Sequence, residues 1–277
     1  MIRHRQGSDF LLITQDDHAR LSGRFAEHLG NDRFAPPEPR AQTLRGIALH
    51  DCGWPLHDER PTLNPRREPL HVLESPMTVA TRVWTESARL AAETDPYAGL
   101  LVSLHVLNLS SIAQRNDGTP HERAHDRQDL FLLNRFQQQE IERQEELRRA
   151  VGMRTDLPLR LGLAKPGSGA DEDRLRFDFG LLRATDAFSL DACCAEPLFA
   201  KVPAVHPRPG EGPIEFVVDH PSTGVLAIEP WPFDVPTIEE TVPSRRVPAV
   251  TYESEQTLWD AYDAATPLPY AVRIVPR

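Results

Sequence analysis

Apolar residues recur with helical spacing over much of the first 194 positions. Leu21, Phe25 and Leu29 lie four residues apart in segment 15–30, which starts with acidic residues suited to capping a helix and stops at Gly30. Segment 97–114 is apolar around most of its circumference, as expected of a buried central helix. The same spacing predicts further helices over 43–51, 77–94, 127–151 and 179–194. A Gly-rich polar stretch over 166–174 predicts a loop before the last of these.

Short runs of β-forming residues occur at the two ends of the sequence. One strand is predicted over 9–14, and proline becomes frequent after Pro197. Beyond that point the pattern predicts a helix at 254–266 and short strands at 214–219, 224–233, 245–252 and 270–276. We therefore expect a helical core over 1–196 and a smaller β-rich region over 197–277 that packs on it. We also expect the late strands to join the N-terminal strand in one sheet. The predicted class is mainly α, or α+β overall.

Composition restricts the classes of partner. The net charge of −10 opposes nonspecific binding to phosphate backbones, so no nucleic-acid partner is expected. No apolar run approaches the roughly 20 residues that cross a bilayer, and the N-terminal segment lacks a signal-peptide pattern, so a cytoplasmic protein is predicted. Cys52, Cys193 and Cys194 form no CxxC pair, which argues against a zinc ribbon or a disulfide scaffold.

The candidate chemistry centres on the segment ALHDCGW at 48–54. His50 and Asp51 are adjacent at the end of a predicted apolar helix, where neighbouring side chains can converge on one ion. A His-Asp pair of this kind is similar to the signature of HD-domain metalloproteins. Taken alone, the pair is more often a helix-end Asp beside a hydrogen-bonded His.

Three residues elsewhere strengthen the metal interpretation. His18, in the predicted first helix, matches the earlier His of an HD site. Asp186 lies among apolar residues, where a bare carboxylate is costly and needs a partner. The predicted ligands are therefore His18, His50, Asp51 and Asp186, for one or two ions of Mn, Fe, Mg, Zn or Ni. His105, in the apolar segment 97–114, has two interpretations of equal weight: a core histidine, or a group that binds a second metal or contacts substrate.

The sequence resembles a bacterial family defined by domain of unknown function 3891. The matching segments are LLITQDDHARLSG, ALHDCGWPLHDERP, LLVSLH, LLRATDAFSL and EPWPF, which span nearly the whole chain in the family's order. After its Asp the family usually has Leu-Ser-Leu, whereas Phe188 precedes Ser189 and Leu190 here. The resemblance implies an HD-like helical bundle with a β-rich C-terminal extension. It implies no activity.

The sequence is compatible with three functions. The leading one is a metal-dependent phosphohydrolase of the HD-domain type, acting on a small phosphoester or nucleotide, with Asp51 and His105 as catalytic residues and Arg82 or Arg183 neutralising the phosphate. The second is an HD-type diiron oxygenase, in which His105 helps to hold a second iron. The third is a non-catalytic protein whose pocket binds a ligand or a structural ion, with the β-rich region serving a partner. In each case the expected partner is a small molecule rather than a membrane.

Overall fold

A computed structural model describes residues 1–115, 126–153, 169–194 and 196–277 of the chain. The strands form one seven-stranded, curled sheet in the order β1-β2-β6-β7-β5-β4-β3. Neighbouring strands are antiparallel except for the parallel pair β5 and β7. The strands are β1 (Ile2–Gln6), β2 (Asp9–Ile13), β3 (Lys201–Val205), β4 (Ile214–Ser222), β5 (Val225–Glu229), β6 (Ile238–Pro248) and β7 (Leu268–Pro276).

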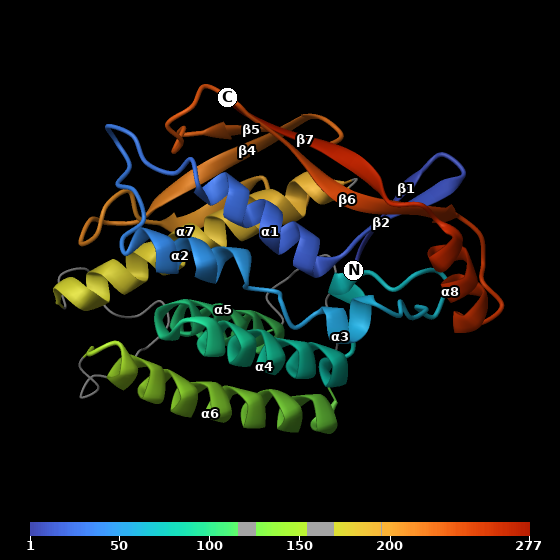
Figure 1. Cartoon of the computed structure of the whole chain (residues 1–277), viewed down its shortest axis with the longest axis horizontal. Coiled ribbons are helices and arrows are strands. Elements are labelled where there is room, and N and C mark those ends of the chain that lie inside the picture. Colours follow the sequence, from blue (N-terminus) through green and yellow to red (C-terminus); the bar gives the residue numbers. More distant parts are fainter. Residues whose placement is uncertain (116–125, 154–168, 195) are drawn as a thin grey trace.

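The helices lie in layers below this sheet (Figure 1). Helices α1 and α7 lie directly beneath it, with α2 beside them, while α4 and α5 form the next layer and α6 the outermost one. Helix α8 packs at the end of the sheet near β1 and β2. The helices are α1 (Gln15–Ala26), α2 (Arg40–Ala48), α3 (Pro55–Asp58), α4 (Met77–Thr94), α5 (Pro96–Arg115), α6 (Arg127–Ala150), α7 (Ala170–Cys193) and α8 (Glu255–Ala264), with a short 3₁₀ turn at Val72–Glu74.

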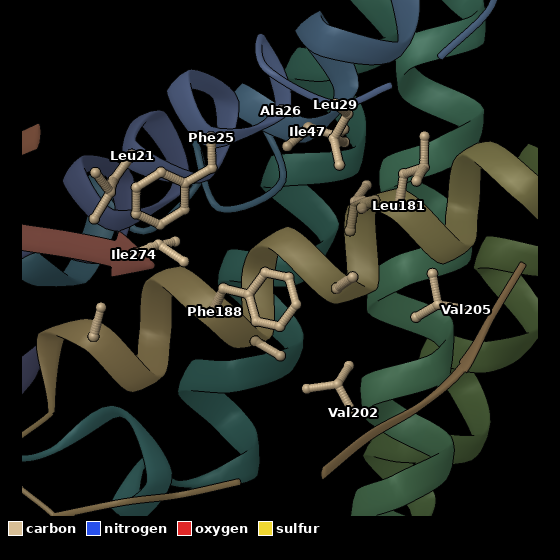
Figure 2. Packing of buried hydrophobic residues seen from close by; sticks show 14 of the residues in the cluster. Leu21, Phe25, Ala26, Leu29, Ile47, Leu181, Phe188, Val202, Val205 and Ile274 are labelled. Atoms are coloured by element: carbon tan, nitrogen blue, oxygen red, sulfur yellow. The ribbon is translucent and has the colours of Figure 1, made fainter. Parts of the chain in front are cut away.

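One hydrophobic core joins the sheet to the first helical layer. Leu21 and Phe25 of α1 face Phe188 of α7 and Ile274 of β7 (Figure 2). The ring of Phe188 also meets that of Phe216 on β4 edge to face, with the centroids 5.5 Å apart. A second cluster fills the space between α4, α5 and α6. Burial of this apolar surface holds the layers together.

The predicted class, a mainly α HD-like bundle with a β-rich extension, is wrong. About half of the chain is helical and about a fifth is in strands, and the sheet forms one wall of the main core. The sheet includes the N-terminal hairpin, because β2 pairs with β6 along Asp9–Pro248, Phe10–Val247 and the following positions. The expectation that the late strands join the N-terminal strand in one sheet is confirmed.

Several predicted elements differ in their limits. The helix predicted over 43–51 is α2, which ends at Ala48, and the helix predicted over 179–194 is α7, which begins at Ala170. Strand β6 lies earlier than the predicted 245–252, and β1 and β3 were not predicted. Of the loop expected over 166–174, residues 166–168 lie outside the described part of the chain. The remaining predicted helices are confirmed to within a few residues.

Helix α5 is the interior helix that its sequence predicts. Its segment Pro96–Gln114 is, among the described residues, the one stretch long and apolar enough to span a membrane, and 67% of it is buried inside the protein. It packs between α4, α6 and α2, and the packing carries His105 into the interior. The apolar character of α5 is therefore accounted for by core packing.

Candidate metal centre

Four segments bring five ionisable side chains together in the interior. His18 lies on α1, His105 on α5 and Asp186 on α7, while His50 and Asp51 occupy the turn between α2 and α3. The three histidines are at most 2% exposed and Asp51 is 5% exposed. The Asp186 side chain is 18% exposed and is the most accessible of the five. All five residues singled out as site residues in the sequence are therefore neighbours in the fold.

The turn that carries His50 and Asp51 is fixed by a close approach to α4. A Cβ atom on Gly53 would lie 2.3 Å from the carbonyl oxygen of Val83 and 2.5 Å from the nitrogen of Ser87, so only glycine fits. The Gly53 N–H donates to Ser87 Oγ at 2.9 Å. The prediction placed His50 and Asp51 at a helix end; they lie in the turn because α2 stops at Ala48 and the chain must bend to reach α4.

One group of possible ligands consists of His18, His50 and Asp51. His18 Nε2 lies 3.1 Å from Asp51 Oδ2, and His50 Nε2 lies 3.8 Å from the same oxygen. The other oxygen of this carboxylate, Oδ1, accepts a hydrogen bond from the indole N–H of Trp54 at 3.0 Å. Trp54 thus sets the orientation of the Asp51 carboxylate and leaves Oδ2 directed at the two imidazoles.

A second group consists of His50, His105 and Asp186, and it shares His50 with the first. Asp186 Oδ1 lies 3.3 Å from His50 Nε2 and 3.8 Å from His18 Nε2. Asp186 Oδ2 lies 3.7 Å from His105 Nε2. The two oxygens of Asp186 therefore face different histidines, and the two groups adjoin along this carboxylate.

Hydrogen bonds outside the cluster fix the imidazoles of His18 and His50 in the orientation that metal ligands adopt, whereas Nδ1 of His105 has no such bond among the described residues. His50 Nδ1 lies 2.7 Å from the carbonyl oxygen of Ile47 and must donate to it, which leaves Nε2, 3.3 Å from Asp186 Oδ1, to carry a proton or to bind a cation. His18 Nδ1 lies 2.9 Å from Ser189 Oγ. When the Ser189 hydroxyl donates to the carbonyl oxygen of Asp186, 3.0 Å away, His18 Nδ1 is the donor to Ser189. Histidines that bind metals usually donate their second nitrogen in this manner.

The charges in the cluster shift the ionisation of its members. Burial lowers the pKa of His50, but the carboxylates of Asp51 and Asp186 raise it by more, and its pKa reaches about 9. Burial raises the pKa of the Asp51 and Asp186 carboxyls, but the histidines outweigh this effect and hold both pKa values below the usual range. Burial lowers the pKa of His105 to about 4, so this imidazole is neutral at pH 7. Without a bound cation, a proton on His50 partly balances the two carboxylates.

The two arginines considered as phosphate-binding groups occupy different places. Arg183 lies one helical turn before Asp186, with its guanidinium over the Phe179 ring at 5.8 Å from the centroid. Its charge acts on both Asp186 and His105, and no described residue forms an ion pair with it. Arg82 is an exposed residue of α4 and lines a separate groove. Arg183 is therefore the arginine beside the cluster.

Two residues that orient the ligand His18 were not predicted from the sequence. Ser189 lies three residues after Asp186 and so shares its helix face, and Ser22 lies four residues after His18 and contacts Ser189 Oγ at 2.7 Å. A hydroxyl group three or four residues from a predicted ligand indicates a residue that can orient that ligand, so the sequence contained a signal for both serines. The role of Ile47 left no signal, because it acts through its backbone carbonyl.

Fold and site together define a class: an α+β protein in which a curled sheet backs a helical core that holds a buried His/Asp cluster suited to a divalent cation. Residues 1–249 match the family described as protein of unknown function (DUF3891), and the chain belongs to that family. Neither the curated proteins nor the solved structures contain a match.

Proposed function

We propose that this protein binds a divalent cation in the His/Asp cluster and hydrolyses a small phosphoester there. The observation that carries the proposal is the fully buried Nε2 of His50, which lies 3.3 Å from Asp186 Oδ1 and is left to bind a proton or a cation because Nδ1 donates to Ile47. A buried acceptor that faces a buried carboxylate is unfavourable unless a proton or a cation lies between them. Three histidines and two carboxylates offer more metal-ligand atoms than a single proton can bind.

The spacing of the donor atoms supports a shared ion. Metal bonds to histidine nitrogen and carboxylate oxygen are roughly 2.0–2.2 Å long, so two ligands of one ion lie about 3–3.5 Å apart. His18 Nε2 and Asp51 Oδ2 are 3.1 Å apart, and His50 Nε2 and Asp186 Oδ1 are 3.3 Å apart. The order of ligands along the chain is that of HD-domain metalloproteins. We therefore propose that this protein shares the metal chemistry of HD-domain metalloproteins, although its fold differs from theirs.

The neighbouring residues supply the other parts of a hydrolytic site. When bound, a divalent cation lowers the pKa of a coordinated water and polarises a phosphoryl oxygen. Arg183 is placed to bind a second phosphoryl oxygen, since its guanidinium has no competing carboxylate partner among the described residues. His105 is neutral at pH 7 and can accept a proton, and Trp54 holds the Asp51 carboxylate in place.

A second function, oxygen-dependent chemistry on two irons, is favoured by one observation. His105 Nε2 faces the second oxygen of Asp186, so a second group of ligands adjoins the first. Two irons per chain and a change of colour with oxygen would favour this function over hydrolysis. A bound ion without turnover of any substrate would instead support a non-catalytic role.

The test is a phosphatase assay on a panel of nucleotides and small phosphoesters, with Mn²⁺, Fe²⁺ or Mg²⁺ supplied. We expect hydrolysis that depends on the cation and falls by at least about a hundredfold in Asp51→Asn, because loss of one ligand changes both charge and geometry at the ion. Asp263→Asn, which removes an exposed carboxylate that pairs with Arg60, is the matched control and should leave the rate unchanged. Equal rates in wild type and Asp51→Asn would exclude the hydrolytic proposal.

A further inference from the structure

A groove between α4 and α6 lies apart from the His/Asp cluster. It has a volume of about 330 Å³ and includes Leu56 of α3 at its edge. Its α6 wall comes from positions 132, 135, 136 and 139, which share one helix face, and its α4 wall from positions 81, 82, 85 and 86. Pockets of this volume accommodate small molecules. No residue of the His/Asp cluster lines it.

The groove presents two positive charges that no described carboxylate neutralises. Arg135 has no hydrogen-bond or ion-pair partner within the described residues, and Arg82 only donates a long hydrogen bond, 3.4 Å, to the carbonyl oxygen of Leu56. Glu86, the one acidic lining residue, is already bound by Arg89, whose Nη2 and Nε atoms lie 2.6 and 2.8 Å from its two oxygens. The charge of Glu86 is therefore offset from outside the groove.

The groove is basic although the chain carries a net charge of −10. Several other arginines, such as Arg60 and Arg66, pair with carboxylates. Arg82 and Arg135 line the same concavity and are both exposed, so an anion bound there can accept hydrogen bonds from both guanidiniums. Apolar lining from Leu56 and Leu132 and an exposed amide from Gln139 complete a surface suited to a small organic anion.

We propose that this groove binds a small molecule with at least two negative charges on phosphoryl groups, such as a diphosphate ester. Arg82 and Arg135 bind the phosphoryl oxygens, the amide of Gln139 donates a further hydrogen bond, and the apolar side chains of Leu56 and Leu132 cover the organic part. The site is independent of the metal centre, and it stands whether or not the proposed hydrolysis is correct.

The probe is inorganic pyrophosphate, titrated calorimetrically at fixed ionic strength into protein whose metal has been removed by chelation and dialysis. We expect saturable binding at one site per chain that weakens about tenfold in Arg135→Gln and in Arg82→Gln, because each variant removes a charge-assisted hydrogen bond. Arg60→Gln makes the same change in net charge at an exposed position away from the groove, and it should alter the affinity by less than about twofold.

A further variant tests the role of Arg89. Arg89→Gln releases the Glu86 carboxylate to repel the anion, so it should also weaken binding although it removes no direct contact. The absence of saturable binding would overturn the proposal, as would equal weakening in Arg60→Gln. Binding that is lost in Asp51→Asn and retained in both groove variants would place the pyrophosphate at the His/Asp cluster and would also refute it.

Discussion

Asp178 should make the stability of the protein fall as the pH rises towards neutrality. The side chain lies on α7 and is fully buried, and Oδ2 accepts a hydrogen bond from the Tyr97 hydroxyl at 2.6 Å. Burial raises the pKa of Asp178 to about 7, and the Tyr97 hydrogen bond, the charge of Arg174 and polar contacts with Glu38 and Thr43 only partly oppose it. The folded protein therefore binds this proton more tightly than the unfolded chain does.

The size of the effect follows from the pKa difference. The pKa of Asp178 rises from 3.8 to about 7 on folding, and each unit is worth about 1.4 kcal/mol, so ionised Asp178 costs up to about 4 kcal/mol of folding free energy. Because the folded pKa is the higher one, this cost is absent below pH 3.8, grows as the pH rises to about 7, and is constant above that. Between pH 5 and pH 8 the group alone should remove about 2–3 kcal/mol.

The assay is urea unfolding of metal-free wild type and Asp178→Asn at pH 5 and pH 8. Asparagine retains an oxygen for the Tyr97 hydroxyl and cannot ionise, so the free energy of unfolding of Asp178→Asn relative to wild type should increase by about 2–3 kcal/mol from pH 5 to pH 8. Asp260→Asn removes an exposed carboxylate of α8 and controls for net charge. A difference between Asp178→Asn and wild type that is the same at both pH values would refute the reasoning.

Three further predictions concern the metal centre. Since the pKa of His50 is about 9, cation binding at pH 7 should release about one proton, and the logarithm of Kd should fall by about one per pH unit. Calorimetry in buffers of different ionisation enthalpy measures this release. Binding without proton release would contradict the prediction. Ser189→Ala removes the acceptor for His18 Nδ1 and should weaken cation binding about 10–100-fold in the same titration. Gly53→Ala forces the His50–Asp51 turn away from α4 and should lower the free energy of unfolding by about 1–3 kcal/mol or more. Gly212→Ala, where an added Cβ meets nothing within 4 Å, should leave the free energy of unfolding unchanged.

The members of the site could be predicted from sequence because their chemistry conflicts with their surroundings. Asp186 and His105 lie within strongly apolar segments, and both belong to the cluster in the interior. The backbone geometry of the site could not be predicted from the sequence. Nothing local indicates that Gly53 must touch α4, a contact made with residues 30 and more positions away, so the helix was extended through His50 and Asp51.

The fold was mispredicted where long-range pairing decides it. The β1 sequence IRHRQ has little apolar character, yet Ile2 is buried because β2 pairs with β6, more than 230 residues later. Contacts of that sequence separation leave no local pattern. The first turns of α7 are acidic and polar and read as a loop, but Leu175 and Phe177 are buried in the main core and extend the helix to Ala170. Tertiary packing thus overrides local preference at both places.

The central claim is that His18, His50, Asp51 and Asp186 hold a divalent cation. Elemental analysis of protein purified without added metal tests it most directly, performed in parallel on wild type, Asp186→Asn and Asp260→Asn. The account predicts one or two divalent ions per chain in wild type and in Asp260→Asn, and loss of most of this metal in Asp186→Asn. Wild-type protein that contains no divalent ion and takes up none from Mn²⁺, Fe²⁺ or Zn²⁺ solutions would contradict it.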